Sequence, residues 1–370
     1  MSSSYEFWLT DDTGKRITML KNFSWASYSR SSRGLGVIQL GLPLEEHLAF
    51  APTVFQPDWR IDVWRSPEYG FPKRRESSYM LRKFRIYDRE EDGMRQFEFF
   101  GRTPLDILRR WSVYSTTEAD YKKTDYIDDM MKAIVTQEFV TGAHCVPTGE
   151  LTVEGDLSLG PSITHSFLGK TVRDVLDELK AISFTKNQDS SSNRRIFFDV
   201  VESGPTAVNG FNYIFRTYAD LRGIDRTNGI VFSPENGNLK SPEYFEDYLD
   251  QVTVAQVAAT QVSSPDTTLS RWNSIMNYKS SSSADATVNT SIANRMLAEQ
   301  GKDISFGAYI LNTPGSPTQP RSLYGIDWDF GDLLPVQYAG VNMEAEVEIV
   351  WVSVDEMGSE NIVGSNRVGV

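Results

Sequence analysis

Strict alternation between apolar and acidic residues at 343–351 constrains the fold of this chain more than any other feature. Apolar side chains occupy the odd positions, namely Met343, Ala345, Val347, Ile349 and Trp351. Carboxylates lie between them, namely Glu344, Glu346 and Glu348. Because successive side chains of a strand point to opposite faces, the pattern predicts a β-strand with one apolar and one acidic face. Neighbouring like charges destabilise a sheet, so the acidic row indicates a face that stays exposed to solvent or that repels a negatively charged molecule.

The chain is long enough for two or three domains. It has 370 residues, of which 40% are hydrophobic and 12% aromatic, as is typical of a folded globular protein. The single cysteine, Cys145, excludes an intrachain disulfide framework. We find no signal peptide and no apolar run long enough to span a bilayer, so we expect a protein made in a cytosol without a membrane anchor.

Charge is distributed unevenly along the chain, whose formal net charge is −13. Residues 1–115 contain 18 basic and 15 acidic residues, a net charge of +3. The corresponding numbers are 12 and 18 for residues 116–235, a net charge of −6, and 7 and 17 for residues 236–370, a net charge of −10. The negative net charge of residues 236–370 argues against binding of nucleic acid phosphates by this region.

Residues 1–115 read as a series of short β-strands. Apolar and polar residues alternate in 36–42 and 59–64, and Asp11–Gly14 indicates a hairpin turn. Strands at this spacing are typical of a barrel or a sandwich.

A basic stretch at 67–78 interrupts these strands, and we expect it to form a projecting loop. It carries Lys73, Arg74 and Arg75. Loop charges are most often simply solvated. The contrast with the acidic last third nevertheless favours docking of this loop onto an acidic partner.

An α+β region follows, at 116–235. Apolar residues recur at helical spacing in 125–139 and 171–182, and Thr171 with Asp174 resembles a capping box. A strand pattern follows at 195–201. We therefore predict a small α+β domain between two β-rich parts.

The last third returns to β structure at 236–354. Strand patterns at 249–257 and 306–311 flank a helix predicted near 286–300. Residues 355–370 are polar, and we expect them to be mobile until a partner binds.

No group of residues predicts catalysis, a cofactor or a metal. The sequence has three histidines, no Gly-x-Ser-x-Gly motif and no glycine-rich phosphate loop. His144, Cys145 and His165 do not have the spacing of a zinc site. Asp327–Asp332 does not follow the order of a calcium loop, so we interpret it as a tight turn leading into the next strand.

Five segments in a fixed order carry a resemblance to a known family. A Gly-Val-Ile-Gln-Leu strand at 36–40 precedes the strand Trp59–Arg65. Then come Phe100–Leu108, the helical insertion and the closing turn Gly325–Leu333. This order resembles that of the tail-tip (baseplate) hub proteins of long-tailed phages, in the siphophage hub-like family.

The closing turn is similar to that family's Asp-Tyr-x-Leu-Gly-Asp signature. Asp327, Gly331 and Asp332 are the matching positions. Trp328, Asp329 and Phe330 replace the usual central residues.

The resemblance implies an α+β, mainly β, fold with two tail-tube-like β-barrel domains. The first barrel would span 1–115, an inserted α+β domain 116–235, the second barrel 236–354, and a polar tail 355–370. The family is trimeric. Three copies, each with two similar barrels, make a pseudo-sixfold ring that caps the hexameric tail tube.

The implied function is structural and requires no cofactor. Such a ring adapts sixfold to threefold symmetry and forms the channel through which the tape-measure protein and then DNA leave. Implied partners are a distal tail protein or tail tube ring and a fibre or receptor-binding protein, in the tail tip of a virion assembled in the host cytoplasm. An acidic lumen repels phosphate, so Glu344, Glu346 and Glu348 are the candidate lumen-facing row.

Two alternative functions stay open on the sequence alone. Exposed aromatic side chains would suit a virion-associated carbohydrate-binding module. A pair of carboxylates would suit a cell-wall-degrading enzyme, but no pair stands out among the 50 acidic residues.

Overall fold

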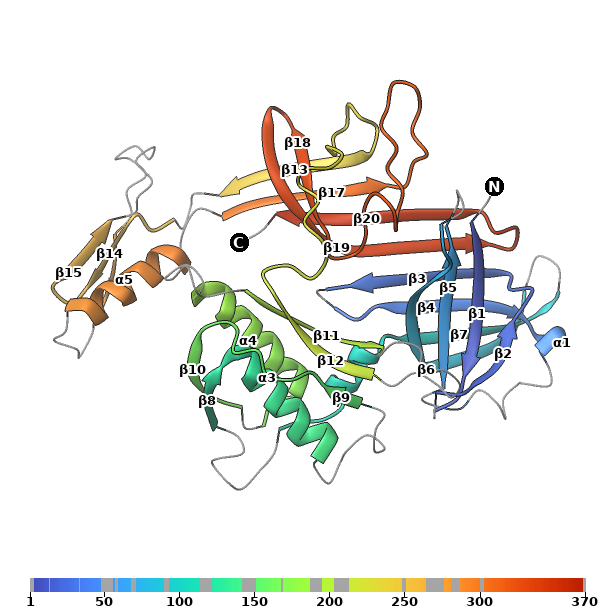
Figure 1. Cartoon of the computed structure of the whole chain (residues 1–370), viewed down its shortest axis with the longest axis horizontal. Coiled ribbons are helices and arrows are strands. Elements are labelled where there is room, and N and C mark those ends of the chain that lie inside the picture. The colour runs from blue at the N-terminus through green and yellow to red at the C-terminus, as the bar shows by residue number, and fades with distance from the viewer. Residues whose placement is uncertain are drawn as a thin grey trace.

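The computed structural model describes residues 3–368, apart from 13, 33, 48–55, 57–58, 68–70, 90–92, 114–121, 142–150, 168, 187–194, 203–212, 248–250, 264–275, 281–285 and 300–302. Its strands form one large sheet and three small ones (Figure 1). Among the described helices, none is both long and apolar enough to cross a membrane.

Strands from both ends of the chain build the large sheet, which has 12 strands. The first β unit contributes β1 (Ser4–Thr10), β2 (Arg16–Leu20), β3 (Trp25–Ser31), β4 (Val37–Pro43), β5 (Arg60–Ser66), β6 (Arg74–Asp88) and β7 (Arg95–Arg102). The second β unit contributes β13 (Leu239–Asp247), β17 (Asp303–Leu311), β18 (Leu333–Tyr338), β19 (Val341–Asp355) and β20 (Glu360–Val368). A short helix α1 (Leu44–His47) follows β4.

The two β units are fused edge to edge. β19 pairs antiparallel with β3, from Ile349 opposite Ser31 to Asp355 opposite Trp25. One hydrophobic core consequently contains residues of both units. The mainly β character that we predicted is confirmed, whereas two separate barrels are not, since no sheet of the described residues closes on itself.

The alternating segment forms β19, but its phase changes in the middle. Ala345 and Val347 are buried as predicted. A bulge then occurs between Val347 and Ile349, and beyond it the even-numbered Val350 and Val352 are buried. The prediction that Trp351 faces the core is therefore wrong, because the extra residue in the bulge turns it to the opposite face, where it is 41% exposed.

The expectation of a mobile C-terminal tail is wrong for most of that tail. Glu360–Val368 forms β20, which lies between β17 and β19. Ile362, Gly364 and Asn366 are buried and alternate with more exposed neighbours. Residues 369–370 lie outside the described part.

The inserted unit has its own core beneath the large sheet (Figure 1). Its helices are η1 (Pro104–Arg109), α3 (Ile127–Val135), η2 (Thr136–Thr141) and α4 (Val172–Lys186). Its strands are β8 (Lys122–Tyr126), β9 (Leu151–Val153), β10 (Ser162–Ser166), β11 (Ile196–Glu202) and β12 (Tyr213–Ala219). Both predicted helices are confirmed, and the Asp174 amide donates to Thr171 Oγ1 at 3.1 Å as a capping box requires.

A small arm lies to the side of the large sheet (Figure 1). It contains β14 (Val254–Val257), β15 (Thr260–Ser263), β16 (Met276–Lys279) and α5 (Ala286–Glu299). The predicted helix is confirmed as α5. It packs on β14 and β15 around Ala255, Val257, Ala293 and Met296, apart from the main core.

Replacing Trp328 tests the fused core. Its side chain is fully buried and packs against Tyr324, with ring centroids 5.1 Å apart. We expect Trp328→Ala to lower the free energy of unfolding by about 3–5 kcal/mol, the usual cost of truncating a buried aromatic side chain. Urea denaturation followed by circular dichroism measures this. Trp351→Ala, at the exposed position, should cost less than about 1 kcal/mol, and an equal loss in both variants would contradict the assigned burial.

Candidate functional site

The closing turn, Gly325–Leu333, and the two residues before it connect the first β unit, the second β unit and the linker at 222–226. The family-like Asp332 is buried, with 2% of its surface exposed. Its carboxylate accepts hydrogen bonds from the Ile224 amide at 2.8 Å, the Asp329 amide at 2.8 Å and Arg226 Nε at 2.5 Å. Asp332 thereby fastens the linker that leaves the inserted unit onto the turn that begins β18.

The other two family-like residues fix the backbone of the same turn. Asp327 accepts from the Leu323 amide at 2.9 Å and from Arg321 at 2.8 and 2.9 Å. Gly331 has a φ of +85°, in the left-handed region that glycine adopts without strain. A Cβ atom there would lie 3.1 Å from the Gly223 amide nitrogen. The segment Asp327–Asp332 contains the turns expected from the sequence, and a family-like role for these three residues stays a prediction.

Asp329, which replaces a central residue of the signature, links the turn to the first β unit. It accepts from Arg30 Nη1 at 3.1 Å and from Arg74 Nη1 at 2.5 Å. Beside it, the buried Tyr324 hydroxyl donates to Glu76 Oε2 at 2.6 Å. Burial alone would raise the pKa of Asp329, but the two guanidinium groups outweigh burial and lower it.

A second ion pair continues this seam to β20. Arg65 donates to Glu360 at 2.7 and 3.0 Å and to the Tyr324 carbonyl at 3.1 Å. The Tyr5 hydroxyl and Ser3 Oγ also donate to Glu360, at 2.5 and 3.0 Å. Burial would raise the pKa of Glu360, but Arg65 lowers it overall. The first and second β units are therefore joined by hydrogen-bonded ion pairs as well as by the sheet.

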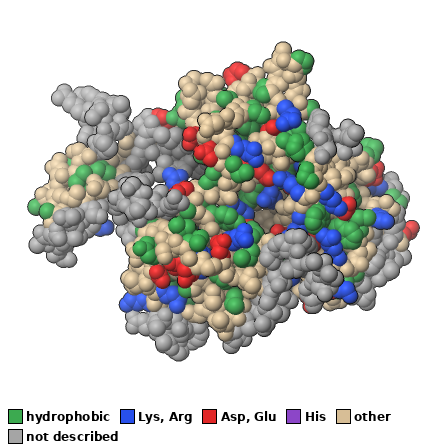
Figure 2. All heavy atoms as spheres, in the orientation of Figure 1, with side chains coloured by type: hydrophobic (Ala, Val, Ile, Leu, Met, Phe, Trp, Pro, Cys, Tyr) green, Lys and Arg blue, Asp and Glu red, His purple; other side chains and the backbone are tan. Residues whose placement is uncertain are grey.

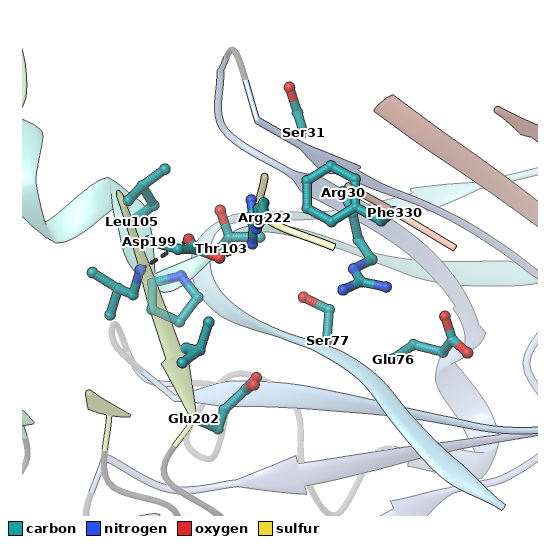
Figure 3. A pocket seen from close by; sticks show the side chains of 13 residues that line it. Arg30, Ser31, Glu76, Ser77, Thr103, Leu105, Asp199, Glu202, Arg222 and Phe330 are labelled. Carbon is teal, nitrogen blue, oxygen red and sulfur yellow. Dashed lines mark hydrogen bonds and ion pairs between the residues drawn. The ribbon is translucent and has the colours of Figure 1, made fainter. Parts of the chain in front are cut away.

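A cavity of about 60 Å³ lies where this seam meets the inserted unit. Arg30 and Glu76 line one side, and Asp199 and Arg222 line the other, where they form an ion pair (Figure 3). Ligand pockets usually measure about 300–1,000 Å³. The space is too small for a substrate, and its charges of both signs make it a junction between units.

Arg74 and Arg75 form ion pairs between units instead of lying on a projecting loop, whereas Lys73 is exposed and pairs within the first β unit. β6 begins at Arg74, so the loop prediction is wrong for Arg74 and Arg75. Lys73 pairs with Glu6, Arg74 with Asp329, and Arg75 with Glu202 at 3.4 Å. In the orientation of Figure 1, Lys and Arg side chains are visible near the centre of the molecular surface (Figure 2). Docking of these residues onto a partner stays a prediction.

The three carboxylates of the acidic row differ in environment. Glu344 is exposed, whereas Glu346 and Glu348 are half-buried. Burial and the charge of Glu348 raise the pKa of Glu346 to about 7, although Lys180 and Arg222 oppose this shift. A lumen-facing role for the row stays a prediction.

No group of three or more His, Cys, Asp or Glu side chains in the described part of the chain is placed to hold a metal ion. The acids of the closing turn bind amides and guanidinium groups instead. His144 and Cys145 lie outside the described residues.

Comparisons with known proteins give matches in fold. No family model and no curated protein matches the sequence. The 43 kDa tail protein of prophage MuSo2 from Shewanella oneidensis is 13% identical, with a TM-score of 0.56 over 100% of this chain and 98% of that one. The chain has the fold of phage tail proteins.

Two further tail proteins agree with this finding. One, from Neisseria meningitidis, is 10% identical, with a TM-score of 0.51 over 99% of this chain and 96% of that one. The other, a prophage tail protein from Listeria monocytogenes, is 10% identical, with a TM-score of 0.51 over 97% and 94%. These similarities confirm, at the level of fold, the resemblance to phage tail proteins found in the sequence.

Removing the Asp332 carboxylate should destabilise the closing turn. We expect Asp332→Ala to lower the free energy of unfolding by about 3–5 kcal/mol, because Arg226 and two amides lose their acceptor in a buried place. Chemical denaturation at pH 7 measures this. The matched control is Arg95→Ala, which removes an exposed pair with Asp88 and should cost less than about 1 kcal/mol. Comparable losses would contradict the assigned role of Asp332.

Glu346 should make stability fall as the pH rises. Its folded-state pKa of about 7 exceeds the ordinary value of 4.5, so the folded state binds the proton more tightly than the unfolded state. Ionisation between pH 4.5 and 7 therefore opposes folding. We expect Glu346→Gln to be more stable than wild type by about 1–2 kcal/mol at pH 8, with the difference vanishing near pH 4. A difference independent of pH would refute the raised pKa.

Proposed function

We propose that this chain is a structural, non-catalytic component of a phage tail tip, and that three copies close into a ring around a channel. An internal duplication of the large sheet carries this proposal. The fold shared with phage tail proteins supports it.

The large sheet (Figure 1) contains two four-stranded groups with the same strand order relative to the chain. β13-β17-β20-β19 is followed directly by β3-β4-β7-β6. The fourth strand of each group, β19 or β6, has 15 residues and pairs over its first half with an additional strand, β18 or β5. Each also has a central bulge, between Val347 and Ile349 in β19 and between Leu81 and Lys83 in β6. The bulges align Lys83–Asp88 with Ile349–Val354.

One of these equivalent edges is covered and the other is open. In β19, β18 pairs only with the first half of the strand, and β3 pairs with the second half along the same edge. In β6, the β5 ladder ends at Met80, and β7 is the only strand of the described chain that pairs with the residues beyond Leu81. The duplication therefore predicts that a strand from another copy covers this edge.

Burial at equivalent positions supports this prediction. Val350 and Val352 are 1% exposed beneath the β19–β3 junction. The equivalent residues of β6, Phe84 and Ile86, are 38% and 44% exposed. Apolar side chains at a sheet edge favour association, because covering them removes apolar surface from water.

The strand equivalent to β3 is β13, which ends the sheet on the opposite side. Pairing β6 of one copy with β13 of the next repeats the internal junction head to tail. Such contacts between different surfaces produce a ring when the rotation closes. With two groups per chain, three copies supply six equivalent groups, which adapts threefold to sixfold symmetry.

The ring would cap a tail tube in the virion and let the tape-measure protein and DNA pass through its channel. A tube or distal tail protein and a fibre or receptor-binding protein are the proposed neighbours. In this arrangement we keep Glu344, Glu346 and Glu348 as the proposed lumen-facing row and Lys73–Arg75 as a proposed contact to a neighbour. The domain boundaries near 115 and 235 are likewise proposals.

The open edge of β6 provides the test. We expect the protein to associate as its concentration rises, reaching three times its mass of 41.8 kDa. Replacing both Phe84 and Ile86 by Lys should abolish association and leave the monomer folded, since both side chains are already exposed. Sedimentation velocity and circular dichroism measure these two outcomes.

Met357→Lys is the matched control, because Met357 is 84% exposed in the turn between β19 and β20, away from the β6 edge. This variant should associate like wild type. A wild-type chain that remains monomeric at all concentrations, alone and with tail tubes, would disprove the ring.

A further inference from the structure

A basic groove of about 650 Å³ adjoins the open edge of β6. Five of the described residues that line it are basic, namely Arg82, Lys83, Arg102, Arg109 and Arg110. Asp106, the single acidic residue among them, pairs with Arg82 at 2.8 Å, Arg102 at 3.1 Å and Arg110 at 3.4 Å. The lining thus has four more positive than negative charges, in a chain whose net charge is −13.

The internal duplication indicates which segment of a second copy would lie beside this groove. In the covered junction, Trp351 of β19 lies opposite Ser29 of β3. Arg85 of β6 is equivalent to Trp351 by the alignment of the bulges. The pairings that lead from β20 through β17 to β13 match those that lead from β7 through β4 to β3. Compared position by position, they place Glu243 of β13 where Ser29 lies in β3. Glu243 of one copy would therefore lie opposite Arg85 of the next.

Alternate side chains of β13 point away from the main core, to the same face of the sheet as the groove. Tyr244 packs against the main core, so Glu243, Phe245 and Asp247 occupy the opposite face of the strand. Phe245 is 50% exposed. On the partner strand, Arg85 alternates with Phe84 and shares the face of the groove.

We propose that the basic groove and Arg85 receive the acidic end of β13 from a second copy of this chain, an inference that rests on the proposed ring. Glu243 pairs with Arg85. Asp247 lies in the groove, where positively charged side chains outnumber negative ones, and Phe245 covers the apolar surface at Val37 and Phe100. Arginine suits this contact, because Arg85 already binds Glu98 and its guanidinium has donors for a second carboxylate. Opposite charges at one contact steer the association and fix its register.

A charge swap tests the contact. Arg85→Glu and Glu243→Arg should each weaken self-association about tenfold or more, because each places like charges opposite one another. The double variant in one chain restores an opposite pair at every contact of a head-to-tail ring, and should recover association to within about threefold of wild type. Arg216→Glu, on β12 of the inserted unit, is the control for the same change of charge and should have no effect. Sedimentation velocity at two salt concentrations measures all four variants.

The outcomes separate this inference from the ring itself. Association of wild type that is unchanged by both single variants, or a double variant no better than the singles, would overturn the pairing and leave the ring intact. Binding of a short DNA duplex by wild type, lost in Arg85→Glu, would show instead that the groove receives phosphates. A wild type that never associates would overturn both proposals.

Discussion

The pairing of β19 with β3 is the interaction on which the rest of the structure depends. It places residues from opposite ends of the chain in one ladder, for example Val354 opposite Ala26. The entropy lost in closing so long a loop grows only with the logarithm of its length, so burial of a few apolar side chains can offset much of it. Val350, Val352 and Val354 supply that burial. Without this ladder, the two β units would have separate cores and a free edge each.

Charges at the seam determine how the two units are fixed relative to each other. Asp329 and Glu360 of the second unit each pair with an arginine of the first unit, and Glu76 of the first unit accepts a hydrogen bond from Tyr324. Removing one member of a buried pair costs far more than an apolar replacement of both, so such pairs favour one arrangement over alternatives. Because the pKa values of Asp329 and Glu360 are lowered in the folded state, the stability they provide is present above their unfolded-state pKa values. It declines as the pH falls through the folded-state values.

Local patterns in the sequence predicted local structure well. The periodicities that indicated α4 and α5, and the interpretation of Asp327–Asp332 as a turn, depend on residues a few positions apart. The seam gave no such signal, because Arg65 and Glu360 are 295 positions apart and Arg30 and Asp329 are 299 apart.

Two wrong predictions, the burial of Trp351 and the mobility of the C-terminal tail, have the same physical cause. Trp351 and most of the tail lie in strands at the centre of a sheet, whose structure depends on their partner strands. The bulge in β19 depends on its partner β20, so the strict alternation of the sequence misplaced Trp351. The polar composition of 355–370 suggested a mobile tail, yet Asn366 is buried between neighbouring strands. The family resemblance implied two barrels, and strand patterns could not test this, because they show alternation along the chain but not which edges meet.

The edges of β13 and of the second half of β6 differ in a way that selects one of the three possible pairings between them. β13 contains Pro242, a left-handed Ser241 with a φ of 49° and a register shift between Lys240 and Glu243, all of which hinder indiscriminate pairing. Its acidic end would repel a second β13, and the basic β6 edge would repel a second β6. Only the unlike pair brings opposite charges together. An isologous dimer is therefore disfavoured at both edges, and the contact that remains is head to tail, which is the kind that can form a ring.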